Sequence, residues 1–385
     1  MIANIWILLF VLHFGFASGN NSVLGSKKLA QTASQTCGLQ EAEEACPKTS
    51  CRIYYPATAT VCRATATFNI DRPTTLIGDG EGSAIQWAAG VPGIECLNQA
   101  GMATTIQGMH FESLSNSRLP FQTGLDDGIW NQCNYMKILD NIIQGFGRYG
   151  INTDTTTPHA NANGSLYEGN LIVATGSDCM YFAGPNSKAI TTINNILTNC
   201  GGFGIRQVGG ADHNVSINDE VASSGYNPHT NSQVCSSGPT DFVHGSYYDS
   251  GYTNFYFNPY NEGGCNSVLI LAGFDTLWIE GGYGAVQHVY GPHSTIPSGY
   301  MNSVWNLGGN FASSQPSVSP TQASHTLTLT PRTFAFLPAC SAALAGETAE
   351  ITDSKTNTWG EVIAGGGKYT VSAHCNGSSW TVMGD

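Results

Sequence analysis

The segment Met136-Lys-Ile-Leu-Asp-Asn141-Ile-Ile holds a pattern that recurs downstream in the chain. It returns as Leu166-Tyr-Glu-Gly-Asn170-Leu-Ile and as Ile190-Thr-Thr-Ile-Asn-Asn195-Ile, so the asparagines are 29 and 25 residues apart. Each copy alternates apolar and polar residues, which is typical of a short strand, and a turn of small residues follows it. The register extends upstream to Gly108 and downstream to Asp219, which gives a period of 24 to 33 residues. A repeat of this length, made of short strands and turns, predicts a β-solenoid.

The composition also favours an all-β chain. Charged residues make up 11% of the 385 residues, 46 residues are glycine, and no long stretch shows the 3.6-residue period of a helix. The net charge of −13 and the 14 scattered Lys and Arg residues speak against nucleic acid as a partner, because phosphate binding needs clustered basic side chains. The hydrophobic content of 41% suffices for one large and one small domain.

Residues 1–19 are predicted to form a signal peptide, which implies secretion and no membrane attachment after cleavage. Residues 2–17 are apolar apart from Asn4 and His13, and Ala17-Ser-Gly19 supplies small residues for the cleavage site. An uncleaved anchor is the alternative interpretation, because no Lys or Arg precedes the apolar run. That run is slightly shorter than the ~20 residues of a spanning helix.

The 12 cysteines agree with an oxidising compartment. No CxxC pair has the spacing of a zinc site, so disulfides are favoured over a metal. The sequence leaves the pairing open. Cys179 and Cys200, for example, are either a disulfide pair or separate packing residues that face the solenoid core.

The short segment Gly38-Leu-Gln-Glu-Ala-Glu-Glu-Ala-Cys46 consists of good helix formers. A helix here, just before the solenoid, would cap the open end of its core. Residues 312–325 have the composition of a linker. The predicted organisation is a signal peptide (1–19), a flexible leader (20–37), a β-solenoid (38–311), a linker (312–332) and a C-terminal β-module (333–385).

The line Phe68-Asn-Ile-Asp-Arg-Pro-Thr-Thr-Leu-Ile-Gly-Asp-Gly-Glu-Gly-Ser83 resembles the first turns of the pectate-lyase superfamily, which includes polygalacturonases and phage tailspikes. Together with the asparagine repeats, this resemblance implies a right-handed parallel β-helix over roughly residues 38–310. It does not imply one activity, because that fold carries lyases, hydrolases, epimerases and adhesins. In such a fold the repeated asparagines are expected to form a side-chain amide ladder.

The C-terminal module is expected to be a small β-domain. The segment Cys375-Asn-Gly-Ser-Ser-Trp380 between short apolar runs is a hairpin signal. Cys340 and Cys375 are its only cysteines, which predicts a disulfide that would stabilise a domain with a small core. The module resembles one found at the C-termini of secreted bacterial and phage-tail-like proteins. Attachment, homotrimer formation and capping of the solenoid are all compatible with that resemblance.

The repeat register selects the candidate catalytic carboxylates. Asn152-Thr-Asp154 matches the Asn-Thr-Asp motif of polygalacturonases, but Asp154 lies out of phase with the repeat. The in-phase position before each Gly-Ile pair holds Asp127, Tyr149, Asp178 and Phe203 in successive turns.

Asp127 and Asp178 are therefore predicted to be catalytic, with Asp126 as an additional acid beside them. Two turns of strand spacing put the pair roughly 9 to 10 Å apart, near the upper limit of ~9.5 Å for an inverting glycosidase. The alternative is that each Asp accepts backbone N–H bonds in a turn. Phe203 stands where the resemblance implies a catalytic-site histidine.

Two groups of residues are predicted to bind substrate. Tyr149, Arg148 and Arg206 lie near the candidate acids and suit sugar hydroxyls or a carboxylate. An aromatic cluster between residues 247 and 260 suits stacking on sugar rings, or else forms a packed core or interface. The residues of that cluster taken as candidates are Tyr247, Tyr252 and Tyr256.

The predicted function is recognition of an extracellular polysaccharide, with hydrolysis by a carboxylate pair and no cofactor. One alternative is a non-catalytic adhesin or tail-fibre-like protein. Another is a polysaccharide lyase, in which calcium would be held by Asp126, Asp127 and Asp178. The lyase ranks behind the hydrolase because no Arg or Lys cluster for proton abstraction is evident. Apart from calcium in the lyase alternative, no metal site is predicted.

Overall fold

The structure is a computed structural model. The predicted signal peptide and residues 20–33 of the predicted leader lie outside the described residues, as does most of the predicted 312–332 linker. No helix in the part of the chain that the structure describes is long and apolar enough to cross a membrane. The structure describes residues 34–99, 103–118, 123–157, 159–227, 229–230, 232–234, 245–262, 268–271, 277–280, 287–290, 303–306, 325–327 and 333–384.

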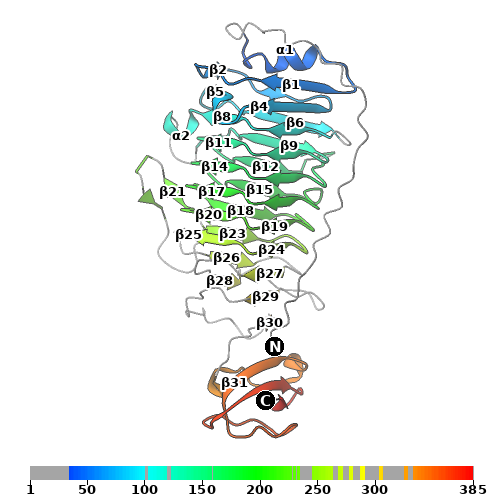
Figure 1. The fold of residues 1–385 in the computed structure, drawn as a ribbon, viewed down its shortest axis with the longest axis vertical. Helices are drawn as coiled ribbons and strands as arrows, with labels where there is room; N and C mark the ends of the chain where they lie inside the picture. The colour runs from blue at the N-terminus through cyan, green and yellow to red at the C-terminus, as the bar shows by residue number, and fades with distance from the viewer. Residues whose placement is uncertain are drawn as a thin grey trace, which may run out of the picture.

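The chain winds into a parallel β-helix, in which each of the first eight turns gives one strand to each of three parallel sheets (Figure 1). Sheet A contains β1 (Cys51–Tyr55), β4 (Thr74–Gly78), β7 (Thr105–Gln107), β10 (Lys137–Leu139), β13 (Leu166–Glu168), β16 (Thr191–Ile193), β19 (Val215–Ile217), β24 (Phe255–Phe257), β27 (Leu277–Glu280), β29 (Ser303–Asn306) and β30 (His325–Leu327). Sheet B contains β2 (Cys62–Ala64), β5 (Ala84–Trp87), β8 (His110–Ser113), β11 (Ile142–Gln144), β14 (Leu171–Val173), β17 (Ile196–Thr198), β20 (Glu220–Ala222) and β25 (Tyr260–Glu262). Sheet C contains β3 (Phe68–Asn69), β6 (Ile94–Gln99), β9 (Ile129–Cys133), β12 (Ile151–Asp154), β15 (Met180–Ala183), β18 (Phe203–Val208), β23 (Gly245–Asp249), β26 (Val268–Leu271) and β28 (Gln287–Tyr290).

Short elements also lie outside these sheets, among them the helix α2 (Ser115–Arg118) and a hairpin of β21 (Tyr226–Asn227) and β22 (Ser232–Gln233).

The predicted asparagine ladder is present between sheets A and B. Asn141, Asn170 and Asn195 are buried, and the Nδ2 group of each donates to the side-chain oxygen of the next member, with Asp219 as the last acceptor. Each side-chain oxygen from Asn170 to Asp219 also accepts the backbone N–H of the preceding ladder residue. The ladder therefore satisfies backbone groups at a buried corner, where water is excluded.

The residue before each ladder asparagine has a left-handed backbone. Asp140, Gly169 and Asn194 have φ angles of 55°, 67° and 53°. Asp, Gly and Asn tolerate this conformation better than other residues. This explains the Asp-Asn, Gly-Asn and Asn-Asn pairs of the repeated pattern.

Apolar side chains and disulfides fill the interior of the helix. Trp87 packs edge-on against Phe111, with ring centroids 5.6 Å apart. Cys179 and Cys200 are buried and form a disulfide, which settles the alternative left open by the sequence. The other disulfides of the described β-helix are Cys37–Cys62, Cys46–Cys51 and Cys96–Cys133.

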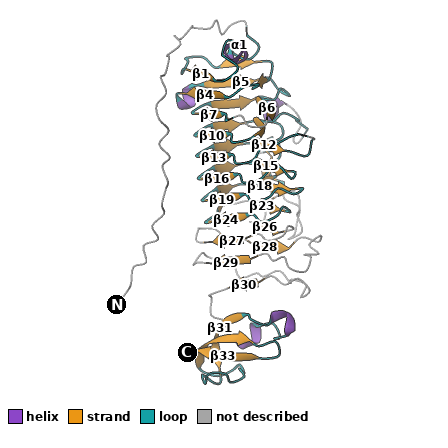
Figure 2. Cartoon of the chain, turned by 90° about the vertical axis from the view of Figure 1, so that its right-hand side faces the viewer, coloured by secondary structure: helices purple, strands orange, loops and turns teal. Residues whose placement is uncertain are grey.

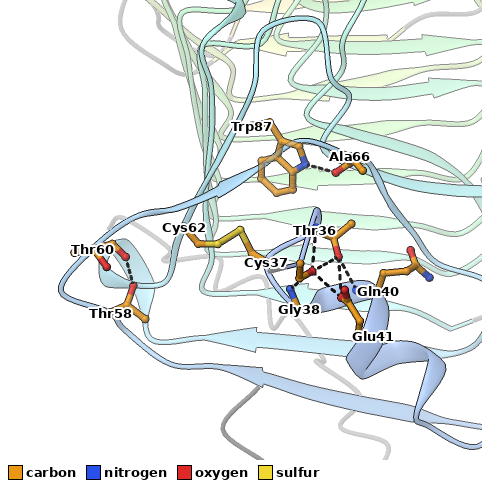
Figure 3. The surroundings of a disulfide bond; sticks show 11 residues. Thr36, Cys37, Gly38, Gln40, Glu41, Thr58, Thr60, Cys62, Ala66 and Trp87 are labelled. Atoms are coloured by element: carbon orange, nitrogen blue, oxygen red, sulfur yellow. Dashed lines mark hydrogen bonds between the residues drawn. A yellow bond between two sulfur atoms is a disulfide. The ribbon is translucent and has the colours of Figure 1, made fainter. Parts of the chain in front are cut away.

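The predicted cap helix is confirmed as α1 (Leu39–Glu44), which covers the first turn of the solenoid (Figures 1 and 3). Leu39 is buried in the core cluster of the β-helix. Glu43 is fully buried, accepts the backbone N–H of Asp71 at 2.9 Å, and lies 3.4 Å from Nε of Arg72. The Cys37–Cys62 disulfide links the segment before α1 to strand β2.

The C-terminal module is an antiparallel sheet of β31 (Thr348–Ser354), β32 (Tyr369–Cys375) and β33 (Trp380–Gly384), drawn in Figure 2. It has its own core, which includes Ile351, Val371 and Trp380. The predicted Cys340–Cys375 disulfide is present.

Candidate functional site

Sheet C carries the residues that the repeat register selected. Strand pairing aligns Ile129, Ile151, Met180 and Ile205 in successive turns. The predicted column of Asp127, Tyr149, Asp178 and Phe203 lies two positions before these aligned residues. Asp127 and Asp178 are thus two turns apart on one side of the helix, which corresponds to about 9.6 Å at a strand spacing of 4.8 Å.

Asp127 is buried and fully engaged with neighbouring residues. Its carboxylate accepts hydrogen bonds from Nε and Nη2 of Arg148, and Nδ2 of Asn152 donates to it at 2.7 Å. Burial raises the pKa of Asp127, against the opposing effect of the Arg148 charge and of these hydrogen bonds. A two-pronged pair of this kind fixes the orientation of both groups.

Asp126 and Asp178 are also buried, and each has separate partners. Asp126 accepts hydrogen bonds from the hydroxyls of Ser113 and Ser115 at 2.9 and 2.7 Å. Asp178 accepts the backbone N–H of Phe203 at 2.7 Å and lies 3.9 Å from Nη1 of Arg206. The three predicted acids therefore lie below the surface of the same region without meeting in one cluster.

Asp154, which lies out of phase with the repeat, has a local role in a turn. Its side chain accepts hydrogen bonds from the backbone N–H and the hydroxyl of Thr156 at 2.9 and 2.6 Å. It therefore stabilises the turn that follows β12.

Above the buried acids, sheet C presents an aromatic and cationic surface. The rings of Tyr149 and Tyr181 stack in parallel, with centroids 4.4 Å apart and planes 3° apart. Burial raises the pKa of both tyrosines, so their hydroxyls stay protonated at neutral pH and remain hydrogen-bond donors. We call this surface the sheet C outer face and define it by its half-buried side chains, which are Trp130, Arg148, Tyr149, Tyr181, Arg206 and Tyr248.

Both arginines of the sheet C outer face lie over aromatic rings. The guanidinium carbon of Arg148 is 5.0 Å from the ring centroid of Tyr149 and 5.7 Å from that of Trp130. The guanidinium carbon of Arg206 is 5.1 Å from the ring of Tyr248. These distances are those of cation–π contacts, which hold the guanidinium planes in place.

The structure brings Tyr149, Arg148 and Arg206 together, as predicted, but it corrects two other predicted sugar-binding residues. Tyr247 and Tyr256 are 0% and 1% exposed, and their rings contact each other in the core with centroids 5.8 Å apart. Their faces are therefore unavailable to a sugar ring, and that prediction is wrong. The reason is strand alternation, which turns Tyr247 inward and its neighbour outward.

Tyr252 is 43% exposed and lies in the turn between β23 and β24. This position is outside the sheet C outer face.

Sequence reasoning missed Trp130, Tyr181 and Tyr248. Pairing of the strands places Trp130, Asn152, Tyr181, Arg206 and Tyr248 in one outward column. Each of the first four follows an aligned isoleucine or methionine by one position. The same register that selected the acids could therefore have found this column.

Glu95 is a further residue that the sequence did not single out. It pairs in register with Trp130 and is half-buried at the end of the outward column. Burial and the nearby charge of Asp127 raise the pKa of Glu95.

The predicted acids do not converge into a cation site among the described residues. Arg148 and Asn152 occupy the oxygens of Asp127, while two serine hydroxyls bind Asp126. Calcium needs six to eight convergent oxygen ligands. Among the described residues, no group of three or more His, Cys, Asp or Glu side chains is arranged to hold a metal ion.

No protein-family model matches the chain, and no curated protein matches it by sequence. Among solved structures, the chain is similar to ORF18 of Geobacillus virus E2, with a TM-score of 0.51 and 11% identity over 90% of this chain and 72% of that one. A second match is pectate lyase Pel9A, with a TM-score of 0.31 and 9% identity over 74% of this chain and 68% of that one.

The topology and the first of these similarities agree with the resemblance seen in the sequence. Three parallel sheets receive one strand per turn, and an inward asparagine ladder runs along one corner. The fold is a parallel β-helix. At 11% identity, the similarity to the viral protein bears on this fold alone.

Proposed function

We propose that this protein binds a polysaccharide outside the cell along the sheet C outer face, as a non-catalytic β-helix adhesin. The observation that carries the proposal is the parallel stack of Tyr149 and Tyr181 between two arginine–aromatic contacts. Aromatic rings offer rigid, amphipathic area for the apolar faces of sugar rings, and their fixed geometry lowers the entropy cost of binding. The pectate-lyase-like fold and the disulfides support a polysaccharide-related role in an oxidising environment.

Adhesion is favoured over cleavage because the candidate acids serve the structure. Asp127 is 2% exposed and is held by Arg148, and Asp178 is 1% exposed and accepts a backbone N–H. A general acid must reach the glycosidic oxygen, within hydrogen-bond distance of it. In the present geometry, neither carboxylate is offered to solvent.

Hydrolysis is a second candidate, and one observation favours it. Burial raises the pKa of Asp127 and that of Glu95. A raised pKa is what a general acid near neutral pH requires. The separation of about 9.6 Å between the Asp127 and Asp178 turns is near the wide limit for an inverting pair.

Binding is tested by native affinity electrophoresis in gels that contain neutral or acidic polysaccharides. Tyr181→Ser is expected to weaken retention at least tenfold, which corresponds to about 1.4 kcal/mol. Tyr54→Ser is the matched control, because Tyr54 is 59% exposed on sheet A. Equal retention of the wild type and Tyr181→Ser would remove the sheet C outer face as the binding site.

The same panel of polysaccharides separates the two functions. An adhesin binds without releasing reducing sugar, whereas a hydrolase releases it. Reducing-sugar release by the wild type that disappears in Asp178→Asn or Asp127→Asn would establish the carboxylate pair as catalytic. Release that is unchanged in both variants would exclude this pair as the catalytic site.

A further inference from the structure

The two arginines of the sheet C outer face are equally accessible but have different partners. Their side chains are 30% exposed for Arg148 and 33% exposed for Arg206. Both lie over aromatic rings, and both have a buried aspartate nearby. The difference is in their hydrogen bonds.

Arg148 is already neutralised within the protein. Its Nε donates to Oδ1 of Asp127 at 2.7 Å, and its Nη2 donates to Oδ2 of the same residue. A bidentate ion pair uses two of the five N–H donors and fixes the plane of the guanidinium. Arg148 therefore acts as a support for the rings of Trp130 and Tyr149.

Arg206 lacks such a partner in the described part of the chain. Its closest carboxylate oxygen, Oδ2 of Asp178, is 3.9 Å from Nη1, which is too far for a hydrogen bond. Its Nε is buried and has no acceptor among the described residues. A buried donor without an acceptor costs about 1–3 kcal/mol and is rare in native proteins.

The position of Arg206 is nevertheless well defined. Its guanidinium carbon is 5.1 Å from the ring of Tyr248 and 5.7 Å from the ring of Phe203. Those two rings are 5.4 Å apart and form a wall beside it. The guanidinium is thus held in one orientation before any ligand arrives, which reduces the entropy cost of binding.

A second donor on the same face also lacks an acceptor. Nε1 of Trp130 is buried and has no hydrogen-bond partner among the described residues. Trp130 and Arg206 belong to the same outward column, three strands apart, which corresponds to about 14 Å along the helix. The two ends of the Tyr149–Tyr181 stack therefore hold more hydrogen-bond donors than the acceptors of the described residues satisfy.

We propose that Arg206 binds an anionic group of the polysaccharide, either a carboxylate or a sulfate. Arg148, by contrast, only supports the aromatic surface. This inference rests on the proposed binding at the sheet C outer face and names the ligand chemistry there. A planar or tetrahedral oxyanion matches the free N–H donors of a guanidinium, which bind such groups in pairs. Because the chain carries a net charge of −13, an anionic ligand needs a local cation of this kind for an attractive contact.

The neighbouring charges are consistent with this division. Asp178 lies beside Arg206 and is 1% exposed, so it contacts the guanidinium from within the protein and leaves the outer side to the ligand. Asp127 is held by Arg148 in the turn before Tyr149. Charge selection therefore depends on Arg206.

The test uses native affinity electrophoresis with one polymer backbone in three forms. The probes are dextran, carboxymethyl-dextran and dextran sulfate, and a parallel set is hydroxyethylcellulose, carboxymethylcellulose and cellulose sulfate. The wild type is expected to be retained at least fivefold more strongly by a charged form than by its neutral form. Arg206→Gln is expected to remove this preference for the charged forms. Comparing retention by the carboxylated and the sulfated forms shows which anion is bound.

Arg52→Gln is the matched control, because Arg52 is an exposed arginine on β1 in sheet A, and it should keep the preference. Circular dichroism confirms that each variant is folded. Equal retention of the wild type by neutral and charged forms, or a preference that survives in Arg206→Gln, overturns the role of Arg206 while the proposed binding stands. No retention by any of the six polymers would overturn the proposed binding itself and this inference with it.

Discussion

Replacing Asn170 by alanine tests the stabilising role of the buried amide ladder. The Nδ2 group of Asn170 donates to Oδ1 of Asn195 at 2.9 Å and to the carbonyl of Ile138 at 2.8 Å. Its Oδ1 accepts the backbone N–H of Asn141 at 3.1 Å and the Nδ2 of Asn141 at 3.0 Å. Alanine removes all four hydrogen bonds from a position that is 1% exposed.

The size of the expected destabilisation depends on which neighbouring groups still have a hydrogen-bond partner after Asn170 is replaced. The Asn141 side chain still donates to the carbonyl of Ile106, and Oδ1 of Asn195 still accepts the backbone N–H of residue 170. The backbone N–H of Asn141 is left without its acceptor, which costs about 1–3 kcal/mol, and each of the three remaining lost bonds costs about 1 kcal/mol. Asn170→Ala is therefore expected to lower the free energy of unfolding by about 4–6 kcal/mol.

The assay is urea-induced unfolding followed by far-ultraviolet circular dichroism. Gln144→Ala is the control, because Gln144 lies half-buried on the outer side of β11, close to the ladder. That control is expected to change stability by less than about 0.5 kcal/mol. A loss below about 1 kcal/mol for Asn170→Ala would refute the argument that the ladder satisfies otherwise orphaned backbone groups.

Three further predictions concern the β-helix. Burial raises the pKa of Asp219, so its favourable contribution is present below its unfolded pKa of about 3.9 and is lost as pH rises through the folded pKa. Asp219→Asn, which extends the amide ladder by one member, should therefore be more stable than the wild type at pH 7 and lose this advantage near pH 4. Thermal unfolding at both pH values checks this, and an equal difference at the two would contradict it. The double variant Cys179→Ser/Cys200→Ser opens a loop with a sequence separation of 21 residues, and the chain-entropy relation predicts a loss of about 3 kcal/mol in urea unfolding. No measurable loss would show that the disulfide adds no constraint to the unfolded chain. Gly176→Ala would place a Cβ atom 2.0 Å from the carbonyl oxygen of Gly147, so we expect destabilisation by about 1–3 kcal/mol or a failure to fold. Wild-type stability of this variant would mean that the two turns are free to move apart.

Much of the fold was predictable because its signals are local and repeated. The asparagine pattern predicted the solenoid and the ladder, and the residues before the asparagines supply the left-handed corners. The repeat register also predicted which residues share a column on sheet C, including Asp127, Tyr149 and Asp178. Cys340 and Cys375 could be paired because the module contains no other cysteine.

The candidate site was predictable only in part. Tyr149 was found because it shares the repeat column of the candidate acids, and Arg148 and Arg206 were found because they lie near that column in the repeat register. Tyr247 and Tyr256 were chosen from aromatic composition, and composition does not say which side of a strand faces the core. Trp130 and Tyr181 were missed because the outward column was not followed from turn to turn.

The sequence by itself determined the period and the ladder, since these depend on the spacing of residues along the chain. Only the tertiary structure decided that Asp127 is held by Arg148 and that Arg206 lies 3.9 Å from Asp178 without a hydrogen bond to it. The physical reason is that such hydrogen bonds join neighbouring turns, whose side chains lie 20 or more positions apart in the sequence. Their geometry is fixed by how the turns stack, and a difference of about 1 Å decides whether a buried pair is hydrogen-bonded.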